Sequence, residues 1–513
     1  MKKRHLIATL LAVAAAGIAV PAFASGEPNL VVKTDKGAVR GTTDGELREF
    51  HGIPYASPPR RWTSPRPAAA WTGVRDAKTP GAACAQPVGL PVGVPSEAED
   101  CLYLNVTTPA ARENQGLPVI VWIHGGSMMY GTGDMYGPGR LAAGTVVVSM
   151  NYRLGVLSFL TDPALDAGSP YGSGSLGLED QQAALRWVKA NISAFGGDPG
   201  NVTIMGQSGG GYAVCDHLAS PKSAGLFQRA IIESSPCTGD ASRTRAAAEA
   251  DSKHVIKAVG CADVADVAGC LRSPKTTVAD LLEAYGPMSE PRPVSGTALL
   301  PLSPAEALRT GRFHRVPVLL GVNHDEENGQ YAGAELAPGG GPIPAGQYEP
   351  TLRKEYGDDA AAVMARYPLA GYGDSAGLAL ATIGTDRRWA RPAYDTAALL
   401  TKWTPAYAFE FAEKDTPWFA GYPEPSFPWR AQHMAELAYL FDLDLFEPRT
   451  PAQDRLANRL ITTWTRFAGT GDPGWERFTT RRPSVRSLTS GRWTATEFVR
   501  DHEFAFWSAL DRP

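Results

Sequence analysis

A serine flanked by glycines is the first group in the chain that points to covalent chemistry. Residues 206–210 read GQSGG, which fits the pattern GxSxG and directly follows the strand-like run NVTIM. A helix-compatible stretch comes next. Small residues around such a serine permit a strained strand–turn–helix geometry in which the hydroxyl stands clear of a sheet. A chance glycine-rich turn gives the same five letters, but the preceding strand favours Ser208 as a nucleophile.

A second glycine segment lies upstream, at the end of another strand-like run. His124-Gly125-Gly126-Ser127 follows the residues LPVIVWI. Backbone N–H groups in a turn of this kind stabilise the oxyanion that forms when a serine attacks a carbonyl carbon. Taken alone, the segment also fits a plain turn that ends a strand. Its position before GxSxG in the chain favours the oxyanion interpretation.

A nucleophilic serine needs a base, and the base needs an acid that orients it. Three consecutive acids, Asp325, Glu326 and Glu327, follow the strand-like residues 316–322 (VPVLLGV). From the residues alone, each of the three is a candidate orienting acid, and the run is also compatible with a solvated loop. The chain has nine histidines. The residue types alone therefore do not show which histidine is the base.

The elements that must position these groups are short apolar strands alternating with helices. Strand-like runs cover residues 117–124, 145–153, 201–208, 229–235 and 316–322, and residues 180–192 have apolar positions at helical spacing. This alternation predicts a mostly parallel central sheet with helices on both faces. The glycine- and proline-rich residues 328–350 are expected to form a surface excursion. We expect one catalytic domain over residues 25–513.

The first 24 residues have the features of a secretory signal peptide. Lys2, Lys3 and Arg4 precede an apolar stretch, and Ala22-Phe23-Ala24 provides small residues for cleavage near Ala24. No later segment is continuously apolar over the length of a membrane span, so no membrane anchor is expected. The net charge of −4 without basic runs argues against nucleic acid as a partner.

The six cysteines are expected to form disulfides, because an even number occurs in a chain directed to an oxidising compartment. Zinc binding by these cysteines is the competing interpretation. It is disfavoured, since no CxxC pair occurs and the cysteines have no metal-like spacing with histidines. No metal is therefore expected.

Several further motifs give the chain a resemblance to the type-B carboxylesterase family, which includes bacterial ester hydrolases, fungal lipases and cholinesterases. The motifs are FHGIPYA at residues 50–56, EDCLYLNV at 99–106, HGGS at 124–127, NYRLG at 151–155 and FGGDP at 195–199, all before GQSGG. The resemblance spans nearly the whole mature chain. It implies the α/β-hydrolase fold and hydrolysis of carboxylic esters.

The resemblance also implies which residues act. The acid motif resembles residues 321–326 (GVNHDE) and selects Glu326, and the histidine motif resembles residues 432–441 (QHMAELAYLF) and selects His433. His433 is expected to accept the proton of Ser208 and return it to the departing alcohol, and Glu326 to stabilise the imidazolium. Gly126, Ser127 and Gly209 are the expected oxyanion donors. No cofactor is required.

The family pattern further implies disulfides Cys84–Cys101 and Cys261–Cys270. Cys215 and Cys237 are left open, because they fit either a third disulfide or two buried thiols. Two departures from the family concern the site: Gln207 stands where glutamate is usual, and Gly209 where alanine is usual. Because Gln207 has no carboxylate, we expect the site to attract cationic substrates more weakly.

The expected substrates are small neutral carboxylic esters. In cholinesterase-like relatives the loop closed by the first disulfide carries a tryptophan, but residues 85–100 (AQPVGLPVGVPSEAED) contain no aromatic side chain. A lipase acting on long acyl chains is the alternative among enzymes, and a non-catalytic binding protein on the same fold is the alternative from another class. The sequence leaves the physiological ester and the oligomeric state undetermined.

Overall fold

The structure, a computed structural model, describes residues 29–89, 93–112, 115–239, 242–286 and 291–511. The predicted signal peptide lies outside these residues. Within them, no helix has both the length and the apolar character needed to cross a membrane.

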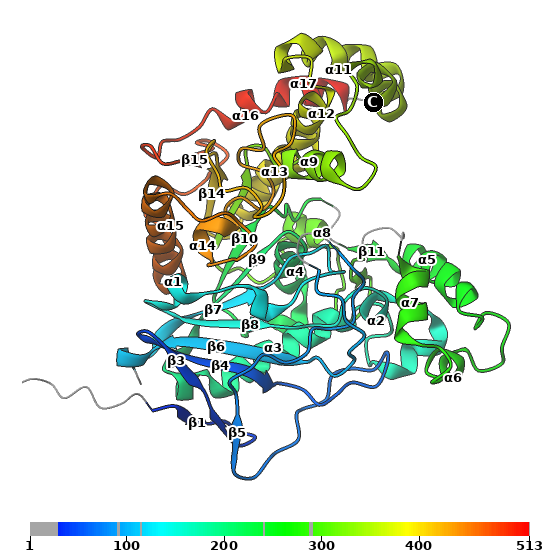
Figure 1. The fold of residues 1–513 in the computed structure, drawn as a ribbon, viewed down its shortest axis with the longest axis vertical. Helices are drawn as coiled ribbons and strands as arrows, with labels where there is room; N and C mark the ends of the chain where they lie inside the picture. The colour runs from blue at the N-terminus through cyan, green and yellow to red at the C-terminus, as the bar shows by residue number, and fades with distance from the viewer. Residues whose placement is uncertain (1–28, 90–92, 113–114, 240–241, 287–290, 512–513) are drawn as a thin grey trace, which may run out of the picture.

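A ten-stranded sheet runs through the molecule (Figure 1). In spatial order its strands are β15 (Val485–Leu488), β14 (Ala406–Phe411), β13 (Val318–Asn323), β10 (Arg229–Glu233), β9 (Gly197–Gln207), β7 (Leu117–Ile123), β8 (Val146–Met150), β6 (Tyr103–Pro109), β4 (Leu47–Pro54) and β3 (Thr42–Asp44). The strands from β15 to β8 are parallel, and β6, β4 and β3 pair antiparallel at one edge. The prediction of a mostly parallel sheet is therefore confirmed.

Side chains of β7 show why the central strands are apolar throughout. Val119 and Val121 belong to one buried cluster, whereas Ile120 and Trp122 belong to another. Because successive side chains of a strand point to opposite faces, a strand buried on both faces has to be apolar at every position.

Helices cover both faces of the sheet. Helices α3 (Leu176–Asn191), α4 (Gly209–Ala219) and α13 (Arg391–Leu400) contribute to the cluster that contains Val119. Helix α15 (Pro451–Thr470) contributes Leu456, Leu460 and Trp464 to the opposite cluster. The α/β-hydrolase architecture predicted for the chain is thus present.

Smaller elements surround this framework. Near the N-terminus, β1 (Val31–Lys33), β2 (Ala38–Arg40) and β5 (Val74–Asp76) form a separate sheet, and β11 (Arg243–Thr244) pairs with β12 (Val294–Ser295). Short helices cover the rest of the body: α1 (Gly139–Ala142), α2 (Gly155–Phe159), α5 (Arg245–Ala258), α6 (Val267–Leu271), α7 (Val278–Tyr285), α8 (Pro304–Thr310) and α14 (Leu437–Leu440).

A helical region follows β13 and projects beyond the sheet at the top of Figure 1. It contains α9 (Asn328–Leu336), α10 (Tyr348–Tyr356), α11 (Ala360–Arg366) and α12 (Ala376–Gly384), joined by α16 (Phe498–Asp501) and α17 (Phe504–Leu510) from the C-terminus. Leu352, Val363, Leu380 and Trp507 share a hydrophobic cluster there. Residues 328–350, expected to be a surface excursion, therefore include helix α9 and the start of α10.

Three disulfides are formed: Cys84–Cys101, Cys261–Cys270 and Cys215–Cys237. The first two are the pairs that the family resemblance implied. The third resolves the alternative that the sequence left open, and it ties α4 to the segment that follows β10. It therefore links two elements that flank Ser208.

Candidate active site

Ser208 occupies a strained turn at the carboxyl end of β9, immediately before α4. Its φ and ψ are 54° and −125°, a conformation that non-glycine residues rarely adopt. Ser127, Met128 and Ser234, which lie in or beside the segments around this turn, also have positive φ. Strained backbone persists only where surrounding structure enforces it, and it clusters at functional sites.

The glycines around Ser208 are required by close backbone approach. A Cβ atom on Gly210 would lie 1.9 Å from the carbonyl oxygen of Ile123, and one on Gly206 would lie 2.4 Å from the backbone of Gly210. A Cβ on Gly209 would lie 3.0 Å from the nitrogen of Ser127. The turn at Ser208 and the glycine segment after β7 therefore lie in close backbone contact.

The three expected oxyanion donors lie in these two segments. In the part of the chain that the structure describes, the N–H groups of Gly126, Ser127 and Gly209 donate to no protein acceptor. N–H groups left unpaired beside Ser208 are available to an oxygen atom of a bound molecule.

The end of strand β10 holds the turn at Ser208 by two hydrogen bonds. The N–H of Ser208 donates to the carbonyl oxygen of Glu233 at 3.0 Å, and the hydroxyl of Ser235 donates to the carbonyl oxygen of Ser208 at 2.5 Å. Glu233 is the last residue of β10 and Ser235 follows it by two residues, so the end of this strand fixes the backbone of Ser208.

Glu326 and His433 meet although 107 residues separate them. His433 Nδ1 lies 2.6 Å from Glu326 Oε2, and the N–H of His433 donates to the carbonyl oxygen of Glu326 at 3.1 Å. The side chain of Glu326 is fully buried, and its second oxygen accepts from the N–H of Asn323 at 2.8 Å. The carboxylate thus orients the imidazole through Nδ1, and Nε2 is the ring nitrogen that Glu326 does not contact.

Gln207 connects the histidine to the turn. Its Nε2 donates to the carbonyl oxygen of His433 at 2.6 Å, which brings the histidine loop against the residue next to Ser208. Among the described residues no hydrogen bond joins the Ser208 hydroxyl to His433. Contacts of this kind often tighten only when substrate binds.

The two flanking acids have other partners. Asp325 lies near Arg430 and His324, with closest distances of 3.7 and 3.2 Å. Glu327 accepts from the indole N–H of Trp389 at 2.6 Å and pairs with Arg388 at 3.1 Å. Of the three consecutive acids, only Glu326 reaches His433.

The electrostatic surroundings favour protonation of His433. Desolvation works against the charged ring, but the charge of Glu326 and the hydrogen bond to it outweigh this and raise the pKa of His433. Two further carboxyls lie buried nearby. Burial raises the pKa of Glu233 and of Glu436, and the negative charge of Glu326 adds to the effect on Glu436. Both are held towards their neutral form.

Trp389 is a site residue that sequence reasoning missed. Its ring contacts that of His433, with centroids 4.7 Å apart, while its indole N–H is fixed by Glu327. It lies in a π-helical segment, Thr385–Ala390, between α12 and α13. The residue belongs to no motif considered in the sequence analysis, and no spacing pattern marks it as a neighbour of the histidine.

Comparison with known proteins assigns the chain to a family. The sequence profile of the Carboxylesterase family matches residues 28–507. The chain belongs to this family. Like the other members, this carboxylesterase is a carboxylic ester hydrolase that acts on small-molecule esters.

Individual relatives cover nearly the whole carboxylesterase chain. Cocaine esterase of Oryctolagus cuniculus is 34% identical over 86% of this chain and 88% of its own. Para-nitrobenzyl esterase of Bacillus subtilis (strain 168) is 33% identical over 87% and 91%. A solved structure of PNB esterase is 31% identical, covers 93% of this chain and 99% of its own, and has a TM-score of 0.74.

We predict that Glu326→Gln lowers kcat by about 10⁴-fold, because a neutral amide does not stabilise the imidazolium. Asp325→Asn is the matched control and should retain most activity. Base catalysis needs neutral His433, so kcat/KM falls as the pH drops through its raised pKa. Removing the charge of residue 326 lowers that pKa and should move this acid limb to lower pH. A larger loss in Asp325→Asn would assign the acid to the neighbouring position.

Trp389→Ala should reduce kcat by up to about tenfold with little change in KM, because an aromatic contact of about 0.5–1.5 kcal/mol that steadies His433 is lost. Trp389→Phe keeps a ring at this position and should recover part of the rate. The rate of labelling by a fluorophosphonate reports the same loss without substrate binding. Equal kcat in the parent and both variants would show that the contact does not position the histidine.

Proposed function

We propose that this carboxylesterase cleaves neutral esters through an acyl-enzyme intermediate formed on Ser208, with His433 as the base and Glu326 as the orienting acid. The hydrogen bond of 2.6 Å between Glu326 and His433 carries the proposal, because it fixes the imidazole in the loop that Gln207 holds against Ser208. Each of these residues also matches the motif position at which the family resemblance places it.

The reaction follows from the positions of these groups. The Ser208 oxygen attacks the ester carbonyl carbon while His433 Nε2 accepts its proton, and a tetrahedral oxyanion forms. N–H groups of Gly126, Ser127 and Gly209 stabilise that oxygen, each contributing about 3 kcal/mol. Collapse breaks the bond to the alcohol, which takes the proton from His433. Water then attacks the acyl group with His433 again accepting a proton, and Ser208 is released.

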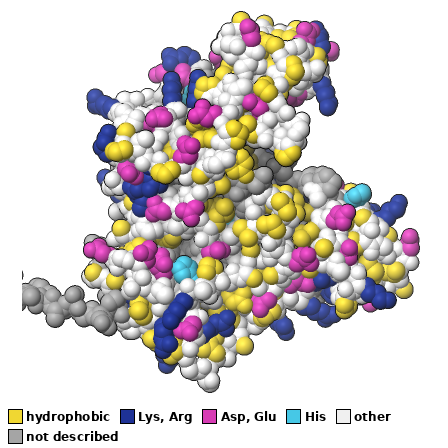
Figure 2. Space-filling view, in the orientation of Figure 1, with side chains coloured by type: hydrophobic (Ala, Val, Ile, Leu, Met, Phe, Trp, Pro, Cys, Tyr) yellow, Lys and Arg dark blue, Asp and Glu magenta, His cyan; other side chains and the backbone are white. Residues whose placement is uncertain are grey.

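The side chain next to Ser208 bears on the charge of the preferred substrate. Gln207 is neutral, buried and bonded to the histidine loop, so it presents no carboxylate to a cationic alcohol group. Hydrophobic side chains border the hollow that Figure 2 shows between the projecting helices and the body of the molecule. These features favour neutral, apolar esters.

Secretion and domain organisation belong to the same proposal. Three disulfides among the described residues fit an oxidising compartment. We infer that residues 1–24 are a signal peptide removed near Ala24, and that residues 25–513 form one catalytic domain secreted from the cell.

The nucleophile is tested by covalent labelling. A fluorophosphonate should label the parent enzyme, because an activated serine hydroxyl beside an oxyanion hole attacks its phosphorus. Ser208→Ala should abolish both labelling and ester hydrolysis. Ser193→Ala, a change at an exposed serine, is the matched control and should be labelled as the parent is. Labelling that survives in Ser208→Ala would place the nucleophile elsewhere.

The charge preference is tested with two butyrate esters. We expect kcat/KM to be higher for an uncharged butyrate ester than for butyrylcholine, provided that the two alcohols have similar intrinsic reactivity. The reason is that cation recognition relies on an aromatic face or a nearby carboxylate. Gln207→Glu restores the usual family carboxylate and should raise the relative rate on butyrylcholine. Equal or higher efficiency of the parent on the choline ester would contradict the proposed preference.

A further inference from the structure

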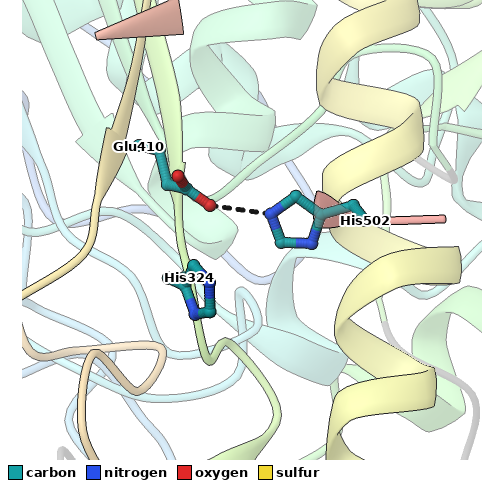
Figure 3. A group of neighbouring side chains, drawn as sticks. All are labelled: His324, Glu410 and His502. Carbon is teal, nitrogen blue, oxygen red and sulfur yellow. Dashed lines mark hydrogen bonds and ion pairs between the residues drawn. The ribbon is translucent and has the colours of Figure 1, made fainter. Parts of the chain in front are cut away.

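Three metal-binding side chains converge beside the candidate active site without belonging to it. They are His324, directly after β13, Glu410 on β14, and His502, directly after α16 (Figure 3). One potential ligand atom from each lies within 4.8 Å of the others. His502 and Glu410 are 1% and 2% exposed, whereas His324 is partly exposed. The group is thus built into the interior and reached from solvent through one imidazole.

We propose that His324, Glu410 and His502 bind a Zn²⁺ ion. Two imidazoles and one carboxylate form a ligand set typical of zinc with an open fourth position, while Mg²⁺ and Ca²⁺ prefer oxygen ligands throughout. The sequence analysis considered only the cysteines as zinc ligands. It did not find this group, because its members are far apart in the chain and come together only through the pairing of β13 with β14 and the return of the C-terminus.

A second layer of contacts already orients the buried histidine as a metal ligand requires. His502 Nδ1 lies 2.6 Å from Asp386 Oδ1, and Asp386 also accepts from the hydroxyl of Tyr367 at 2.7 Å. A carboxylate that accepts from one ring nitrogen fixes the tautomer and directs the other nitrogen to the metal. That other nitrogen, Nε2, lies 2.7 Å from Glu410 Oε1, so the two ligand atoms face each other.

Zinc binding requires only local movement. The proton between His502 Nε2 and Glu410 leaves to solvent, and the ion takes its place with bonds to both atoms. Ligand atoms around tetrahedral zinc are about 3.3 Å apart, since each bond is about 2.0–2.1 Å long. His324 must therefore turn its ring towards the other two, and its exposure leaves room for this. Its present partner is Asp325 at 3.2 Å, which also faces Arg430.

The ion would join three segments that are remote in sequence. His324 directly precedes the acidic run Asp325, Glu326 and Glu327, Glu410 lies on the adjacent strand, and His502 anchors the C-terminal helices. A ligand that binds only the folded state stabilises it in proportion to its concentration over the dissociation constant. Zinc should therefore raise the thermal unfolding midpoint of this carboxylesterase.

The test is equilibrium dialysis of the full-length protein, cleared of metal with a chelator, against Zn²⁺, with the bound metal quantified. We expect one equivalent of saturable Zn²⁺ per chain, unaffected by excess Mg²⁺. His324→Ala should weaken this binding at least tenfold and abolish the rise in unfolding midpoint. His324 is chosen because it is partly exposed, and because the contacts of His502 with Asp386 and Glu410 remain in this variant.

Two controls separate this site from other sources of zinc binding. His254→Ala removes an exposed histidine on α5 and should bind zinc as the parent does. Ser208→Ala should also bind zinc as the parent does, so a failure of the proposed nucleophile leaves this result intact. Absence of saturable binding by the parent, or equal affinity in the parent and His324→Ala, would overturn the proposal and leave the cluster as an ion-paired link between strands.

Discussion

The burial of one carboxyl group constrains the whole candidate active site. Glu326 has no exposed side-chain surface, and a charge in that position is tolerated only if it is paired and hydrogen-bonded. His433 provides the pairing and the N–H of Asn323 provides a further hydrogen bond. Two other buried carboxyls lie nearby: burial raises the pKa of Glu233 and of Glu436, and Glu326 adds to the effect only on Glu436. A charged Glu436 would compete with Glu326 for the same imidazole.

The π-helical segment Thr385–Ala390 serves both sites described above. Its wide turn presents Trp389 to His433 and Asp386 to His502. A regular helix spaces residues about 100° apart, whereas a π turn shifts the side chains that follow it, and such turns occur frequently at functional sites. The segment thus explains how one short stretch between α12 and α13 contacts two groups on different loops.

The sequence was sufficient for those parts of the structure that depend on local pattern. Residues 201–208 were predicted as a strand ending at Ser208, and β9 ends at Gln207, because apolar β-branched residues followed by glycines specify both the strand and its turn. The family motifs added Glu326 and His433, which local pattern left open. Trp389 and His502 escaped prediction, because their roles arise from packing between segments more than 40 residues apart. Helix α9 was missed because glycine and proline dominate its surroundings, while its own apolar residues pack on a distant cluster.

A hydrogen bond between residues far apart in the chain also determines how late in folding the candidate site is completed. Gln207 and His433 are separated by 226 residues, yet their hydrogen bond closes the site. Contacts so distant in sequence form late, since much chain has to be ordered before they contribute free energy. On the proposed mechanism, a chain that ends before His433 lacks the base. Esterase activity would then report on completed folding, because nascent or truncated chains without this contact would be inert towards esters.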